Sequence, residues 1–82
     1  MASEDRIYVA LDEIFRDVFQ RDLPLRADLT AKDVSGWDSF KQIEIIMAVE
    51  ERFALRFTTR ELDSLLSVGD LARIIMAKTT AS

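Results

Sequence analysis

The residues with the clearest chemical potential are Asp38 and Ser39, in the stretch GWDSFKQIEIIMAVEERF at residues 36–53. Ser39 lies where a long helix is expected to begin, and the simplest interpretation of a serine there is a helix cap. A helix start also offers free backbone N–H groups and the positive end of the helix dipole, which together favour a phosphate. The hydroxyl of Ser39 is therefore better suited to being modified than to attacking a substrate.

The rest of the composition gives little support to catalysis by this serine. The chain has no histidine and no cysteine, so it lacks the most frequent general base, the thiolate nucleophile and the most frequent zinc ligands. Lys41 is the nearest alternative base, but side chains two positions apart on a helix do not face each other. The sequence therefore predicts no catalytic residue, no metal site and no disulfide.

Length and charge indicate one globular domain over residues 1–82 that binds other proteins. Hydrophobic residues make up 49% of the 82 residues, and the formal net charge is −4. The scattered basic residues argue against nucleic acid and favour a partner with a basic docking surface. No apolar run is long enough to span a membrane, and the first residues do not resemble a secretory signal. We expect a monomer in the cytoplasm.

Few chain breakers, two glycines and one proline, favour an all-α fold. An amphipathic helix should start with Ser3 as its cap and stop by Leu23, because Pro24 disfavours helix in the residue before it. Its apolar positions recur every three or four residues: Ile7, Ala10, Leu11, Ile14, Val18 and Phe19. A loop without sustained periodicity follows over residues 22–37. Its apolar residues should anchor it to the core: Leu25, Leu29, Val34 and Trp37.

Capping-box spacings predict where three later helices begin. The pairs are Ser39 with Gln42, Thr58 with Glu61, and Ser67 with Asp70. The first of these helices starts after residue 38 or 39 and should run to about residue 53, the next should be short, and the last should fray after residue 78. The sequence thus predicts an all-α four-helix bundle with three longer helices, a short third helix and a long loop between the first two.

The helix after Ser39 has two distinct sides. One is an ordinary core face, formed by Ile45, Ile46, Val49 and Phe53 and expected to pack on the first and last helices. The other, called the docking strip below, combines apolar and acidic residues: Phe40, Ile43, Glu44, Met47 and Glu51. From periodicity alone, the simpler interpretation is that Phe40 and Met47 widen the core. The functional interpretation is that a partner contacts the apolar side chains while the carboxylates orient it.

At these residues the sequence resembles the acyl carrier proteins. Asp38-Ser39-Phe40 is followed by EIIMAVEERF, where family members typically read something like ELVMALEEEF. The resemblance covers nearly the whole chain and implies a carrier without catalytic activity. It implies that a phosphopantetheinyl transferase, using coenzyme A and magnesium, attaches 4'-phosphopantetheine to Ser39 and recognises Asp38. The absent cysteine is then explained, because the reactive thiol arrives on the prosthetic group.

The resemblance also implies partner enzymes that transfer, ligate or condense acyl groups and present basic surfaces. The residues that would contact them are Phe40, Lys41, Glu44, Met47 and Glu51. Lys41 and Arg52 stand where housekeeping carriers of fatty-acid synthesis commonly have acids. Trp37 and RFTTREL at residues 56–62 look more like standalone carriers of specialised lipid, polyketide or related pathways.

We therefore predict a carrier of such a specialised pathway. A housekeeping carrier and an aminoacyl carrier are the alternatives within the family. The approach Gly36-Trp37-Asp38 differs from the glycine-rich approach of peptidyl carriers. A small helical protein-interaction module, in which Ser39 is only a cap, is the alternative outside the family.

Overall fold

The computed structural model describes residues 4–80, which contain helices and no strand. The helices are α1 (Glu4–Phe19), α2 (Ser39–Phe53), α3 (Thr59–Asp63) and α4 (Val68–Thr80), with a short 3₁₀ helix, η1 (Ala31–Asp33). This confirms the all-α fold with three longer helices and a short third helix. No helix in residues 4–80 is long and apolar enough to cross a bilayer. The expected cap at Ser3 lies outside the described residues.

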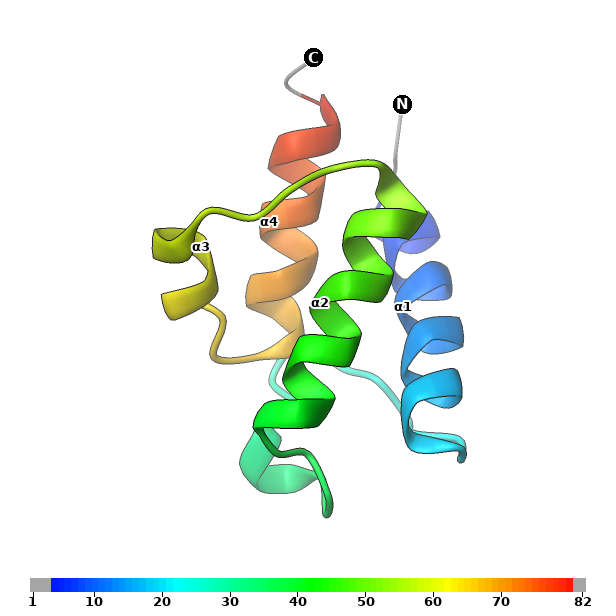
Figure 1. Ribbon diagram of the computed structural model, residues 1–82. Coiled ribbons are helices and arrows are strands. Elements are labelled where there is room, and N and C mark those ends of the chain that lie inside the picture. Colours follow the sequence, from blue (N-terminus) through cyan, green and yellow to red (C-terminus); the bar gives the residue numbers. More distant parts are fainter. Residues whose placement is uncertain (1–3, 81–82) are drawn as a thin grey trace.

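α2 and α4 both pack against α1 (Figure 1). α2 runs antiparallel to α1, and α3 lies to one side, within the connection from α2 to α4. The segment between α1 and α2 includes η1, which the sequence did not predict. Its backbone carbonyls at Leu29 and Ala27 accept hydrogen bonds from Val68 N and Gly69 N, both at 2.9 Å. The start of α2 and the start of α4 therefore lie at the same end of the bundle.

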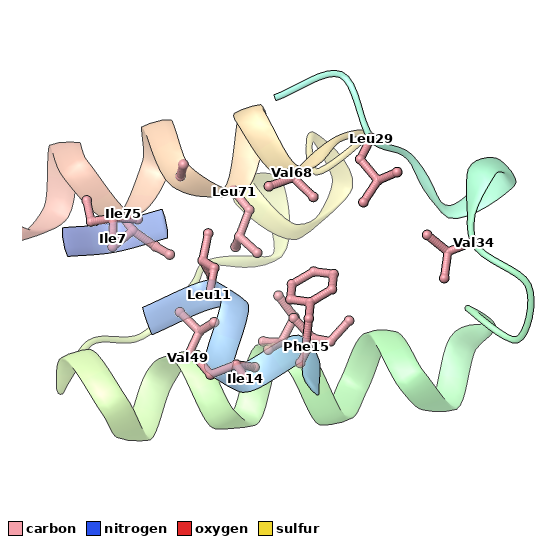
Figure 2. Close-up of a cluster of buried hydrophobic side chains, with 13 residues drawn as sticks. Ile7, Leu11, Ile14, Phe15, Leu29, Val34, Val49, Val68, Leu71 and Ile75 are labelled. Atoms are coloured by element: carbon pink, nitrogen blue, oxygen red, sulfur yellow. The ribbon is translucent and has the colours of Figure 1, made fainter. Parts of the chain in front are cut away.

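A core of buried apolar side chains comes from α1, α2, α4 and the long loop. Phe15 is the largest fully buried side chain, and Figure 2 shows its ring in the middle of the cluster. Phe15 was not among the apolar positions whose spacing predicted the first helix. Phe53 was predicted to be in the core but is only half-buried at the edge, as is Val18. The buried cluster is Ile7, Leu11, Ile14, Phe15, Leu29, Val34, Ile45, Ile46, Val49, Val68, Leu71, Ala72 and Ile75.

Side-chain caps begin the two later helices. The Thr58–Glu61 capping box is confirmed, since Thr58 N donates to Glu61 Oε1 at 2.8 Å and Glu61 N donates to Thr58 Oγ1 at 3.1 Å. Ser67 Oγ accepts from Asp70 N at 3.2 Å, as predicted, whereas the Asp70 carboxylate accepts from Leu66 N at 3.1 Å. α4 continues to Thr80 instead of fraying after residue 78. These local hydrogen bonds fix where α3 and α4 begin.

Acid should weaken the start of α4 through Asp70. The backbone N–H of Leu66 is the main cause that lowers the pKa of this carboxyl below its ordinary 3.8, and Arg73 adds to it. Because the pKa is lower in the folded state, the stabilisation is present above the unfolded pKa and is lost as pH falls through the folded pKa. The thermal midpoint should therefore drop in acid, and Asp70→Asn should show a lower midpoint at neutral pH and a shallower drop. Circular dichroism melts of both proteins from neutral to strongly acidic pH test this, and identical pH profiles would contradict it.

Candidate functional site

The structure places Ser39 as the first residue of α2 and Asp38 as its N-cap. Asp38 Oδ1 accepts a hydrogen bond from Lys41 N at 3.0 Å, and the Asp38 carbonyl accepts one from Gln42 N at 2.9 Å. The predicted Ser39–Gln42 capping box is therefore wrong, because Asp38 provides the cap. The Ser39 side chain is exposed and has no hydrogen-bond partner within residues 4–80. Its hydroxyl is free for chemistry.

The first turn of α2 suits a phosphate ester on this hydroxyl. The cap satisfies the N–H of Lys41, whereas the N–H groups of Ser39 and Phe40 precede any intrahelical bond. α2 is 15 residues long, so the positive end of its dipole adds to these donors. The residues present therefore fit a phosphopantetheine on Ser39.

Trp37 fixes the approach to the serine. Its ring meets Phe15 edge-on with centroids 5.3 Å apart, and Phe19 lies 6.0 Å away on the same side. The indole Nε1 donates to Gln42 Oε1 at 2.8 Å. Trp37, two residues before Ser39, is thus joined to Gln42, three residues after it, and packs against the C-terminal part of α1.

Two cations of α2 bind within the chain, although the sequence analysis had placed Lys41 toward partners. Lys41 Nζ donates to the Val18 carbonyl at 3.0 Å, near the end of α1, and lies 3.6 Å from Glu44 Oε2. Arg52 Nη1 lies 2.9 Å from Glu13 Oε2. Lys41 is therefore directed at the end of α1 and also offsets Glu44, and Arg52 is paired with α1, which leaves Glu51 as the unpaired acid of the docking strip within residues 4–80.

The apolar residues of the docking strip face solvent. Phe40 is 77% exposed, Ile43 56% and Met47 63%, so the interpretation that they widen the core is wrong. Glu44 and Glu51 are exposed beside them, and Glu51 has no ion-pair partner in the described part of the chain. An exposed strip of this kind starts directly beside Ser39 and follows α2 toward its C-terminus.

A groove of about 570 Å³ opens next to Ser39, between the long loop, α2 and the region of α3 with the residues that follow it. Below it is a smaller and more enclosed hollow of about 40 Å³, which reaches Val68 and Leu71. The sequence analysis did not identify the groove, because its walls come from the loop, α2 and α3, which no local pattern brings together. The groove is lined by Ala31, Trp37, Asp38, Ser39, Gln42, Ile43, Leu62 and Leu65.

Comparison with known proteins agrees with this geometry. The family described as phosphopantetheine attachment site matches residues 9–75, most of the chain. The solution structure of holo acyl carrier protein from Geobacter metallireducens superposes with a TM-score of 0.83 and 35% identity, covering 99% of this chain and 88% of that one. A putative mitochondrial acyl carrier protein of Schizosaccharomyces pombe is 40% identical over 35 residues, which are 43% of this chain and only 31% of that relative.

The match to the family and the match in three dimensions cover the same helices and include the turn that carries Ser39. Both relatives are named as acyl carrier proteins, and the solved one is in its holo form. The chain therefore belongs to the acyl carrier protein family, as a carrier with covalently bound 4'-phosphopantetheine and not as an enzyme.

Proposed function

We propose that Ser39 is the residue that bears the phosphopantetheine. The observation that carries this proposal is the exposed Ser39 hydroxyl, unbonded within residues 4–80, at the first position of α2. In the loading step the hydroxyl oxygen forms a bond to the phosphorus that bears the pantetheine in coenzyme A. The phosphoanhydride bond breaks, adenosine 3',5'-bisphosphate leaves, and the transferase takes up the hydroxyl proton. The bound arm supplies the thiol on which acyl groups are carried as thioesters.

Residues around the serine prepare it for this step. Asp38 holds the first turn of α2 through the N–H of Lys41, and its carboxylate is proposed as a feature that the transferase recognises. The N–H groups of Ser39 and Phe40 are available to the phosphate oxygens. Because Lys41 is directed to Val18, its charge stabilises the end of α1.

Loading of the purified protein tests the proposal directly. The chain is incubated with coenzyme A, magnesium and a broad-specificity phosphopantetheinyl transferase, and its intact mass is recorded. A carrier gains one phosphopantetheine, and a peptide map should place it on Ser39. A chain that gains no mass would contradict the attachment at Ser39, and one modified elsewhere would move the site.

We further propose that the docking strip binds the transferase and the acyl-processing enzymes. Phe40 and Met47 would enter apolar contacts, and Glu44 and Glu51 would pair with basic residues of the partner. Exposure of large apolar side chains next to Glu51, which has no ion-pair partner within residues 4–80, supports this, because such a surface commonly marks an interface. Lys41 lies at the edge of this surface, where its ammonium group donates to the Val18 carbonyl and pairs with Glu44.

Charge reversal at Glu51 should weaken partner binding without destabilising the fold. Glu51→Lys places a cation in the docking strip, and because Glu51 is exposed and unpaired within residues 4–80, the thermal midpoint should stay nearly unchanged. The rate of loading at low transferase concentration should fall, and the fall should shrink at high salt. Asp17→Lys is the matched control, since it makes the same charge change on the exposed side of α1. Equal rates for both variants would remove the docking strip from the proposal.

The pathway is proposed to be a specialised lipid, polyketide or related one, and not general fatty-acid synthesis or aminoacyl transfer. The sequence features Trp37 and RFTTREL support this. Lys41 and Arg52 give less support to a specialised pathway, because both bind within the chain. The protein should fail to support growth of a strain that lacks its main acyl carrier protein, even when mass analysis shows it loaded. Normal growth would assign it to the housekeeping class.

We also propose that residues 1–82 form a single carrier domain, which works as a monomer in the cytoplasm. One buried cluster joins α1, α2, α4 and the long loop, which supports one domain. Light scattering of the loaded protein should give the mass of one chain, and a dimer mass would contradict this part of the proposal.

A further inference from the structure

Met47 lies in the middle of the docking strip and is open to solvent. It is one helical turn from Ile43 on one side and from Glu51 on the other, since residues four apart on a helix are neighbours. Its side chain is 63% exposed. It also lines a groove of about 480 Å³ together with Leu55 and Arg56, which follow the end of α2. A small molecule in solution can therefore reach this side chain.

No other sulfur in residues 4–80 is as accessible as that of Met47. The chain has no cysteine and three methionines. Met1 lies outside the described residues. Met76 is half-buried on α4, where it packs against the core. An oxidant that meets the protein before the prosthetic thiol is attached should therefore act on Met47 before it acts on Met76.

A hydroperoxide is the class of oxidant that fits an exposed thioether. The sulfur lone pair attacks the outer oxygen of the peroxide, so that an S–O bond forms while the O–O bond breaks. The sulfur is oxidised by two electrons and the peroxide is reduced by two. The peroxide's proton ends on the leaving oxygen, which departs as water or an alcohol. The product is methionine sulfoxide, in which an apolar side chain has become polar.

This change would act on close contacts and leave the charges of the docking strip as they are. The thioether of methionine is polarizable and adapts to an apolar partner surface. A sulfoxide oxygen buried in the same contact loses its water and needs a hydrogen-bond donor that an apolar surface does not offer, which is unfavourable. The sulfoxide has no net charge, so Glu44 and Glu51 attract basic residues as before.

We propose that Met47 is a reversible oxidation site, through which hydroperoxides lower the binding of this carrier to its partner enzymes. The inference rests on the proposed docking strip and on the attachment at Ser39. Recovery belongs to the methionine sulfoxide reductases, which act with a dithiol. The sulfoxide oxygen leaves as water, the thioether is restored, and the dithiol becomes a disulfide.

Oxidation of the unloaded protein tests the inference. The chain is treated with hydrogen peroxide and desalted, and a peptide map should show one added oxygen on Met47 before any on Met76. Loading at low transferase concentration should then be about three- to tenfold slower than for the untreated protein. The ratio of the two rates should persist at high salt, unlike the effect of Glu51→Lys, because no charge has changed. Both classes of sulfoxide reductase with dithiothreitol, one for each epimer, should restore the rate.

Variants at the two methionines separate this site from other effects of peroxide. Met47→Leu should load at the same rate before and after treatment, although it keeps Met1 and Met76. Met76→Leu should still lose rate on oxidation, as the wild type does. Met47→Gln places a polar, uncharged side chain at this position without peroxide, and glutamine is as good a helix former as methionine. It should load more slowly than Met47→Leu, with a thermal midpoint within about 2 °C of it.

Each result supports or overturns a particular proposal. A wild-type protein that is oxidised at Met47 and loads at its former rate would overturn the inference, while Ser39 remains the attachment site. An equal loss of rate in peroxide-treated Met47→Leu would also overturn it, because the effect would then come from another residue. Met47→Gln decides the matter even if the oxidised protein unfolds: loading as fast as Met47→Leu would contradict the inference. An untreated protein that gains no mass would remove the attachment at Ser39, and this inference with it.

Discussion

Ser39→Ala is expected to abolish phosphopantetheine loading completely while leaving the thermal midpoint within about 2 °C of wild type. The loss is complete because the proposed ester needs the serine oxygen, which alanine lacks. Stability should hardly change because Asp38, and not Ser39, caps α2. Intact mass after incubation with coenzyme A, magnesium and transferase measures the first effect, and a circular dichroism melt measures the second.

Two matched variants serve as controls for Ser39→Ala. Ser35→Ala removes another exposed serine hydroxyl in the same segment and should load like wild type. Asp38→Ala, unlike Ser39→Ala, should lower the free energy of unfolding by about 1 kcal/mol, because it removes the cap of α2. If Ser39→Ala still gained the group, the attachment site would lie elsewhere and Ser35 would be tested next.

Phe15→Ala is expected to lower the free energy of unfolding by about 3–5 kcal/mol. The ring is fully buried and packs against Trp37 and Phe19, so its removal leaves a cavity and withdraws the support of the loop before Ser39. The free energy of unfolding of a small domain can be as low as roughly 5 kcal/mol. A loss of this size should therefore leave much of the variant unfolded at room temperature. Urea titration followed by circular dichroism measures the loss.

Two other phenylalanines serve as controls for this prediction. Phe53→Ala should have a smaller effect, because Phe53 is only half-buried at the edge of the core. Phe40→Ala should change stability least, because Phe40 is 77% exposed. A Phe15→Ala protein that unfolds at the same urea concentration as Phe40→Ala would show that this packing is wrong.

The sequence by itself determined the features that depend on neighbouring residues. The helical period predicted α1 and α2, and Pro24 required the first helix to stop by Leu23; α1 in fact ends earlier, at Phe19, where Gln20 takes a positive φ of 58°. The Thr58–Glu61 pair started α3 because both hydrogen bonds of a capping box close over three residues. The Asp38-Ser39 pair and the residues that follow it indicated the carrier family, which the family match and the structural match then showed.

The tertiary structure decided what depends on residues far apart in the chain. Asp38 and Ser39 are both good caps, and the local sequence does not choose between them; where Trp37 rests on α1 fixes how the chain enters α2. A helical period shows that one side is apolar but not how much of it a neighbour covers. Thus Phe15 is buried between helices while Met47 and Phe40 face water.

The ion pairs of α2 and the groove beside Ser39 also depend on residues far apart in the chain. Lys41 could have faced a partner, but the Val18 carbonyl at the end of α1 lies within 3.0 Å of its ammonium group, and only the packing of the two helices brings them together. The Trp37–Gln42 bond and the groove beside Ser39 likewise join the loop, α2 and the segment after α3. Sequence patterns report local periodicity and caps, whereas burial, ion pairing and cavities depend on which surfaces meet when the helices pack.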